Sequence, residues 1–181
     1  TPRTGARNLI LVLTCAAQFM VVLDVAIVNV ALPSIQRDLG VSQSTLQWVV
    51  IAYGLMLGGF LLFGGRLADL LGRRRILLTG LTIFTAASFL AGISQSIGLL
   101  IAMRGLQGFG AALVAPAALS ILAVTFSEGQ ERNRALGIFG AVGGTSASVG
   151  VIARGLLTAG PGWRWVFFIT VPVGIVAIGL A

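Results

Sequence analysis

Long runs of apolar residues alternate with short polar or charged segments along this chain. Six such runs occupy residues 9–32, 46–63, 76–93, 97–124, 135–153 and 166–181. A helix needs about 20 apolar residues to cross the hydrocarbon core of a bilayer. Backbone groups in lipid must bond within their own segment, so runs of this length predict helices. The pattern predicts an all-α, polytopic membrane helical bundle with six spans, embedded in a lipid bilayer.

The last apolar run is shorter than a full span. Residues 166–181 would extend about 24 Å as a helix, whereas the hydrocarbon core is about 30 Å thick. The chain also begins with Thr1 and not with a methionine. We expect a fragment of a longer protein, with the last span truncated and a C-terminal half missing.

Composition supports a membrane protein and excludes several functional classes. Hydrophobic residues make up 57% of the chain and charged residues only 9%, against about 25% charged residues in soluble domains. The net charge of +7 comes from arginines between apolar runs, which argues against nucleic acid as a partner. With no histidine and only Cys15, we expect no zinc site, no disulfide framework, no metal and no cofactor. Nothing indicates an enzyme, because no cluster of catalytic carboxylates is present.

An arginine-rich segment, residues 64–75, separates the second and third apolar runs. An arginine within hydrocarbon costs roughly 2.5–3.5 kcal/mol, so we expect a short loop in water on the cytoplasmic side. One interpretation is that the segment serves only to set the topology, which requires nothing more than positive charge. A fixed spacing favours instead a structured gating loop that docks against a moving partner. Its residues are Gly65, Asp69 and Gly72, followed by Arg73, Arg74 and Arg75.

The distribution of arginine predicts the orientation of the bundle. If the N-terminus is cytoplasmic, eight arginines lie inside, three lie outside and Arg104 lies within a span, which accounts for all twelve. This excess follows the positive-inside rule. We therefore expect a multi-pass protein of a bacterial inner membrane with a cytoplasmic N-terminus.

Two ionisable residues, Asp24 and Arg104, fall inside predicted spans. Both are expected roughly 10–12 Å below the outer surface, at 1.5 Å per residue. Charges within a membrane are costly and are usually functional, and opposite charges at one depth can meet. The pair could couple proton movement to a conformational change. It could also be a static ion pair that only sets the register of two helices.

Other polar and small residues suggest further roles. Asn29 and Gln107 are candidates to line a cavity within the bundle. Small residues allow transmembrane helices to approach closely. On this ground we expect helix packing at Gly54 and Gly58, and at Gly108, Gly110, Gly140, Gly144 and Gly150.

Four segments, in the right order, resemble motifs of one transporter family. Residues 23–33, LDVAIVNVALP, look like the first-helix signature of the fourteen-helix drug:proton antiporter branch of the major facilitator superfamily. Residues 100–112 resemble the fourth-helix motif of that family, and residues 65–75 resemble its cytoplasmic loop. Residues 163–174 resemble the opening of its sixth helix. The fifth helix departs from the family pattern, with Val151 in place of a proline and Arg154 in place of a glycine.

The resemblance implies the N-terminal six-helix half of a major facilitator fold. It implies proton-coupled efflux of hydrophobic or cationic compounds, with protons and a small-molecule substrate as partners. By the same resemblance, Arg104 is implicated in proton transfer, whereas the role expected for Asp24 follows from its charge and depth. A proton-coupled permease for a specific metabolite, and a non-transporting membrane scaffold or receptor, remain alternatives.

Overall fold

The computed structural model of this chain describes residues 4–157 and 162–180, and of residues 4, 151 and 153–157 it describes the backbone alone. Helices occupy almost all of the described residues, which contain no strand. The fold class predicted from the apolar runs, an all-α bundle, is confirmed. The helices are α1 (Thr4–Leu39), α2 (Gln43–Leu71), α3 (Arg73–Gly92), α4 (Ile97–Thr125), α5 (Gln130–Leu157), α6 (Trp165–Phe168) and α7 (Thr170–Leu180).

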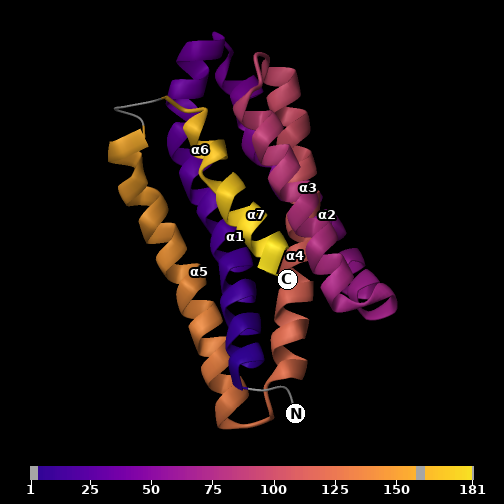
Figure 1. The fold of residues 1–181 in the computed structure, drawn as a ribbon. Helices are drawn as coiled ribbons and strands as arrows, with labels where there is room; N and C mark the ends of the chain where they lie inside the picture. The colour runs from indigo at the N-terminus through magenta and orange to yellow at the C-terminus, as the bar shows by residue number, and fades with distance from the viewer. Residues whose placement is uncertain (1–3, 158–161, 181) are drawn as a thin grey trace.

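Successive long helices run in opposite directions and form a bundle (Figure 1). Helix α4 packs along both α2 and α3, and α1 packs against α5 and α4. Helix α7 contacts α3 and α1. The turn between α2 and α3 therefore lies at the opposite end of the bundle from α6.

Four of the described helical segments are long and apolar enough to cross a membrane: Gly5–Leu39, Gln43–Leu71, Arg73–Gly92 and Ile97–Thr125. Helix α5 is 28 residues long. The apolar segment Trp165–Leu180 is shorter than these four.

The arginine-rich segment is mostly helical, so its interpretation as a loop was wrong. Helix α2 continues to Leu71 because Ala68 is buried in the core, at 1% exposure, and Leu67 packs against the same cluster. The reversal of direction is confined to Gly72, which has a φ of +97°. This left-handed backbone favours glycine, since it has no Cβ. Helix α3 begins at the next residue, Arg73.

Two prolines affect their helices differently. Helix α1 does not end at Pro33 but continues to Leu39, because Ile35 beyond the proline is fully buried. The last apolar run is instead divided at Ile169 into α6 and α7. Pro172 has no N–H to donate to the carbonyl of Phe168, four residues earlier, which favours a break at this point.

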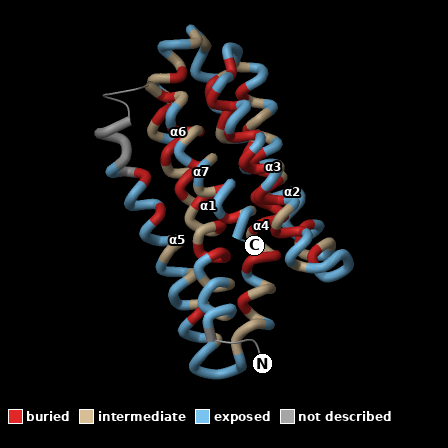
Figure 2. The backbone as a smooth tube through the Cα atoms, in the orientation of Figure 1, coloured by how far each residue is buried: buried red, intermediate tan, exposed pale blue. Residues whose placement is uncertain are grey.

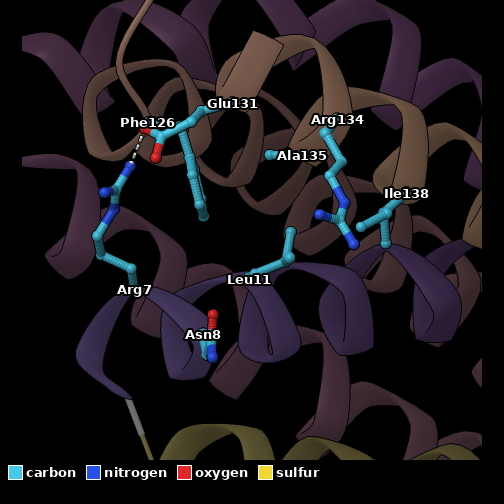
Figure 3. Close-up of a pocket in the computed structure, with 8 residues that line it drawn as sticks. All are labelled: Arg7, Asn8, Leu11, Phe126, Glu131, Arg134, Ala135 and Ile138. Atoms are coloured by element: carbon cyan, nitrogen blue, oxygen red, sulfur yellow. Dashed lines mark hydrogen bonds and ion pairs between the residues drawn. The ribbon is translucent and has the colours of Figure 1, made fainter. Parts of the chain in front are cut away.

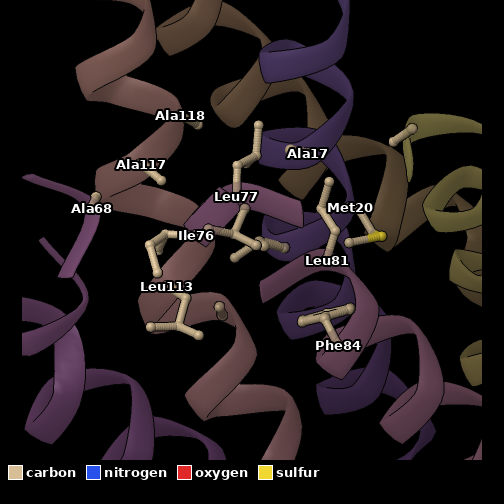
Figure 4. Close-up of a cluster of buried hydrophobic side chains, with 14 of the residues drawn as sticks. Ala17, Met20, Ala68, Ile76, Leu77, Leu81, Phe84, Leu113, Ala117 and Ala118 are labelled. Carbon is tan, nitrogen blue, oxygen red and sulfur yellow. The ribbon is translucent and has the colours of Figure 1, made fainter. Parts of the chain in front are cut away.

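Buried side chains line the inner faces of the helices, while much of α2 faces outward (Figure 2). Leu62 of α2, for example, is 87% exposed, which suits a surface in contact with lipid or with another helix. The larger buried cluster joins α1, α2, α3, α4 and α7 (Figure 4). Its members in that view include Met20, Leu77, Leu81, Phe84 and Leu113.

Glycines allow α4 to approach its neighbours at backbone distance. A Cβ on Gly108 would overlap the carbonyl oxygen of Tyr53 in α2. One on Gly110 would lie 2.9 Å from the carbonyl oxygen of Gly80 in α3. Helix α5 approaches α1 equally closely at Gly150. A Cβ built on this glycine would lie 2.5 Å from the Cβ of Ala26.

The other predicted packing glycines do not take part in helix contacts within the described structure. A Cβ built on Gly54, Gly58, Gly140 or Gly144 meets nothing within 4 Å. The G-x-x-x-G spacing of Gly54 and Gly58 lies on a face of α2 that no described helix covers. The spacing of small residues therefore failed to indicate which helix face is packed.

Replacing Gly108 by alanine is expected to separate α2 from α4. The new methyl group would overlap backbone atoms of Tyr53, and overpacking of this kind costs roughly 1–3 kcal/mol. The matched control is Gly54→Ala, which adds the same methyl group in open space. Thermal unfolding of the full-length protein in detergent should show a lower midpoint for Gly108→Ala only, and equal midpoints would contradict the close packing.

Candidate functional site

The two ionisable residues predicted within spans form a buried ion pair. Arg104 Nη1 of α4 lies 2.5 Å from Asp24 Oδ2 of α1. Asp24 is 0% exposed and Arg104 is 1% exposed. The pairing of these side chains across the bundle agrees with the equal depths expected for them.

Gln107 completes the polar contacts of this ion pair. Its carbonyl oxygen accepts a hydrogen bond of 2.9 Å from Arg104 Nη1, and its amide nitrogen donates one of 3.1 Å to Asp24 Oδ1. Both oxygens of Asp24 therefore have a donor. Arg104 and Gln107 share one face of α4 because they are three residues apart.

The polar cluster extends through two hydroxyl groups to the break between α6 and α7. Gln107 Nε2 also donates a hydrogen bond of 2.6 Å to Ser88 Oγ of α3. Ser88 Oγ lies 3.1 Å from Thr170 Oγ1, the first residue of α7. Thr170 in turn donates to the carbonyl oxygen of Phe167, which lies in α6. A continuous hydrogen-bonded chain thus joins Asp24 to the broken segment.

Helix α2 provides two further contacts to the guanidinium of Arg104. Nε donates a hydrogen bond of 3.1 Å to the carbonyl oxygen of Val49. The ring of Tyr53 lies 4.3 Å from the guanidinium carbon, within the range of a cation–π contact. The hydroxyl of Tyr53 is buried and has no hydrogen-bond partner among the described residues.

The surroundings of Asp24 combine a cationic partner with burial. A nearby guanidinium favours the ionised form of a carboxyl group, and burial without a partner favours the neutral acid. In the structure, Asp24 has its cationic partner and is closed off from solvent. Separation of Arg104 from Asp24 would leave a buried charge without its partner, which is unfavourable.

The predicted gating residues lie at the end of the bundle away from α6. Arg73 and Asp69 approach to 3.8 Å, and both side chains are substantially exposed. An exposed pair at this distance contributes little to stability. The glycine that allows close packing here is Gly64, whose Cβ would overlap the carbonyl oxygen of Ala112, whereas Gly65 has ordinary space around it. Arg74 and Arg75 are exposed.

Of the two candidate cavity-lining residues, Gln107 is buried in the cluster around Asp24, whereas Asn29 lies apart from it. The side chain of Asn29 is exposed and donates a hydrogen bond of 2.8 Å to the carbonyl oxygen of Val25 in its own helix. The side chains of Val151 and Arg154, which depart from the expected fifth-helix pattern, lie outside the described residues.

Sequence reasoning missed several members of the polar cluster. Ser88 and Thr170 are single hydroxyl residues in apolar runs, and Val49 contributes only its backbone. No spacing rule connects these positions to Asp24. Gln107 was identified only as a cavity-lining candidate, although its spacing of three residues from Arg104 could have indicated a shared role.

Removal of Arg104 should destabilise the bundle more than removal of both charges. Arg104→Leu leaves the carboxylate of Asp24 buried without its cation, which costs roughly 3–5 kcal/mol. Adding Asp24→Asn should recover part of this loss, because an amide carries no charge. Thermal unfolding midpoints of the full-length single and double variants in detergent measure both effects. A double variant no more stable than Arg104→Leu would show that the two charges do not depend on each other.

Comparison with known proteins places these features in a family. Residues 14–181 match the family model described as Major Facilitator Superfamily. The chain is 50% identical over 168 residues to the puromycin resistance protein of Streptomyces alboniger, which covers 93% of this chain and 33% of that protein.

Two other relatives are similar over nearly the same region. The cephamycin export protein of Amycolatopsis lactamdurans is 45% identical over 181 residues, covering 100% of this chain and 37% of that protein. A multidrug resistance protein of Mycobacterium tuberculosis is 41% identical over 172 residues, covering 95% and 32%. The chain thus spans about one third of the length of the curated relatives it matches. The family model matches most of this helical chain, and four of the described helices are long and apolar enough to span a membrane. This protein therefore belongs to the major facilitator superfamily of membrane transporters.

Proposed function

We propose that this chain forms the N-terminal bundle of a proton-coupled exporter of hydrophobic or cationic compounds, including drugs. The observation that carries the proposal is the buried contact between Asp24 and Arg104, with Gln107 bonded to both. A charge enclosed in a membrane bundle is costly, so its presence suggests a role in transport. The names of the three relatives, which refer to drug resistance or export, support the same class of substrate.

In the proposed mechanism, Asp24 carries the coupled proton and Arg104 controls when it binds. With Arg104 in contact, the carboxylate is favoured and no proton is held. Movement of α4 relative to α1 would withdraw the guanidinium, and Asp24 would then take up a proton from water. Return of Arg104 would release that proton on the other side. The missing C-terminal half would provide the second bundle against which this one moves.

The proposed orientation has the N-terminus in the cytoplasm of a bacterial cell. The start of α1 and the turns after α2 and α4 lie at the same end of the bundle. Arginines are concentrated there, whereas Arg37 and Arg164 lie at the other end. This arrangement supports the positive-inside assignment.

Asp24→Asn is expected to abolish efflux driven by a pH gradient while leaving a folded protein. The amide preserves the shape of the side chain but cannot take up and release a proton in this range. The full-length transporter would be reconstituted in proteoliposomes, with ethidium and puromycin as probes. The initial rate for Asp24→Asn should fall to that of protein-free liposomes under an imposed gradient.

The matched control for this experiment is Glu128→Gln, which makes the same change in an exposed side chain. It should retain the parental rate. Gradient-driven efflux by Asp24→Asn at the parental rate would show that a residue other than Asp24 carries the coupled proton. A parent that transports neither probe would contradict the proposed substrate class.

Asp69→Asn should slow turnover without changing membrane insertion or stability. Within the described structure its only ion-pair partner is Arg73 at 3.8 Å, and both side chains are exposed. Any loss of turnover must then come from a contact that forms outside this bundle, as a gating role requires. Efflux rate, normalised to the amount of inserted protein, is the measurement. An unchanged rate would leave the segment with a purely topological role.

A further inference from the structure

A cavity of about 290 Å³ lies between the beginning of α1, the end of α4 and the beginning of α5. It is separate from the cluster around Asp24. Figure 3 shows Arg7 and Arg134 on opposite sides of this cavity, with apolar side chains between them. The lining residues are Arg7, Asn8, Leu11, Phe126, Glu131, Arg134, Ala135 and Ile138.

The charges around the cavity leave one cation uncompensated. Arg7 Nη2 donates a hydrogen bond of 2.6 Å to Glu131 Oε2, and its guanidinium lies 5.0 Å from the ring centre of Phe126. Hydrogen bonds from Arg7 and Ser127 hold the pKa of Glu131 below its usual range, so Glu131 balances Arg7. Arg134 has no ion-pair partner among the described residues.

The guanidinium of Arg7 also has an unused donor. Its Nε is buried and bonds to no described residue. A buried N–H without an acceptor is unfavourable. An anion in the cavity could accept hydrogen bonds from both Arg7 and Arg134, and phosphate oxygens suit the planar fork of arginine.

The position of the cavity along the helices favours an amphiphile over a soluble anion. Its polar members, Arg7 and Glu131, precede the apolar runs of their helices, which begin near residues 9 and 135. Leu11, Ala135 and Ile138 belong to the apolar runs themselves, and Ile138 is 38% exposed. The cavity therefore lies where polar and apolar surface meet. Basic pockets between transmembrane helices at this level suit lipid head groups.

From these observations we infer that the cavity binds the phosphate of an anionic phospholipid, held between Arg7 and Arg134, with an acyl chain along Leu11 and Ile138. Arg7 keeps its bond to Glu131 and places its guanidinium beside the head group. Arg134 provides the charge that distinguishes an anionic lipid from a zwitterionic one.

Native mass spectrometry of the full-length transporter in detergent, titrated with phosphatidylglycerol, tests the proposal. Arg134→Gln should weaken retention of this lipid about tenfold, as expected for loss of one charge-assisted hydrogen bond. Arg134→Lys should retain most of the affinity. The matched control is Arg66→Gln, which removes one exposed arginine at the same end of the bundle but outside the cavity.

Each competing result would overturn the proposal. Equal retention by Arg134→Gln and the parent, or equal losses in Arg134→Gln and Arg66→Gln, would show that the cavity is not the lipid site. If phosphatidylcholine bound as tightly as phosphatidylglycerol, the net charge of the lipid would not contribute to its affinity. Displacement of phosphatidylglycerol by millimolar inorganic phosphate would indicate a site for a soluble anion.

Discussion

The buried contact between Asp24 and Arg104 is the interaction on which the arrangement of this bundle depends. An ionised group in an apolar interior is costly unless a partner and hydrogen bonds satisfy it. Satisfying both charges requires α1 and α4 to keep one register, because each donor and acceptor has a fixed position. Gln107 and Ser88 extend the same requirement to α3, and Thr170 extends it to α7. The polar centre of the bundle therefore connects helices that apolar packing alone would align less strictly.

Close helix packing and burial of the charge depend on each other. Gly108 lies one turn beyond Arg104 and brings α4 against the backbone of Tyr53. That approach brings the carbonyl oxygen of Val49 and the ring of Tyr53 to the guanidinium of Arg104. A larger residue at position 108 would move α2 away from α4, and both contacts would lengthen. The glycine thus contributes to the chemistry of the ion pair through the helix spacing it allows.

The two ends of the bundle are held by polar contacts of a different kind. At one end, Asp38 accepts hydrogen bonds of 2.9 Å from Trp163 Nε1 and 3.3 Å from Arg164, which also donates to the carbonyl oxygen of Ser94. At the other end, Arg7 and Glu131 join α1 to α5. The charged side chains of the two ion pairs are partly exposed, so water competes for them and each ion pair is weak.

The sequence by itself determined the fold class, because long apolar runs can only be helices in lipid. It also identified Asp24 and Arg104, since charges in such runs are rare, and it placed them at one depth from the rise of a helix. Only the tertiary structure decided which helix faces meet. Gly140 and Gly144 have the same small side chain as Gly108 but face open space. Residues 64–71 were expected to form a loop, but they continue α2 because Ala68 packs into the core. Ser88, Thr170 and Val49 joined the polar cluster through contacts between distant segments, and spacing along one chain does not specify how a helix is rotated toward its neighbours.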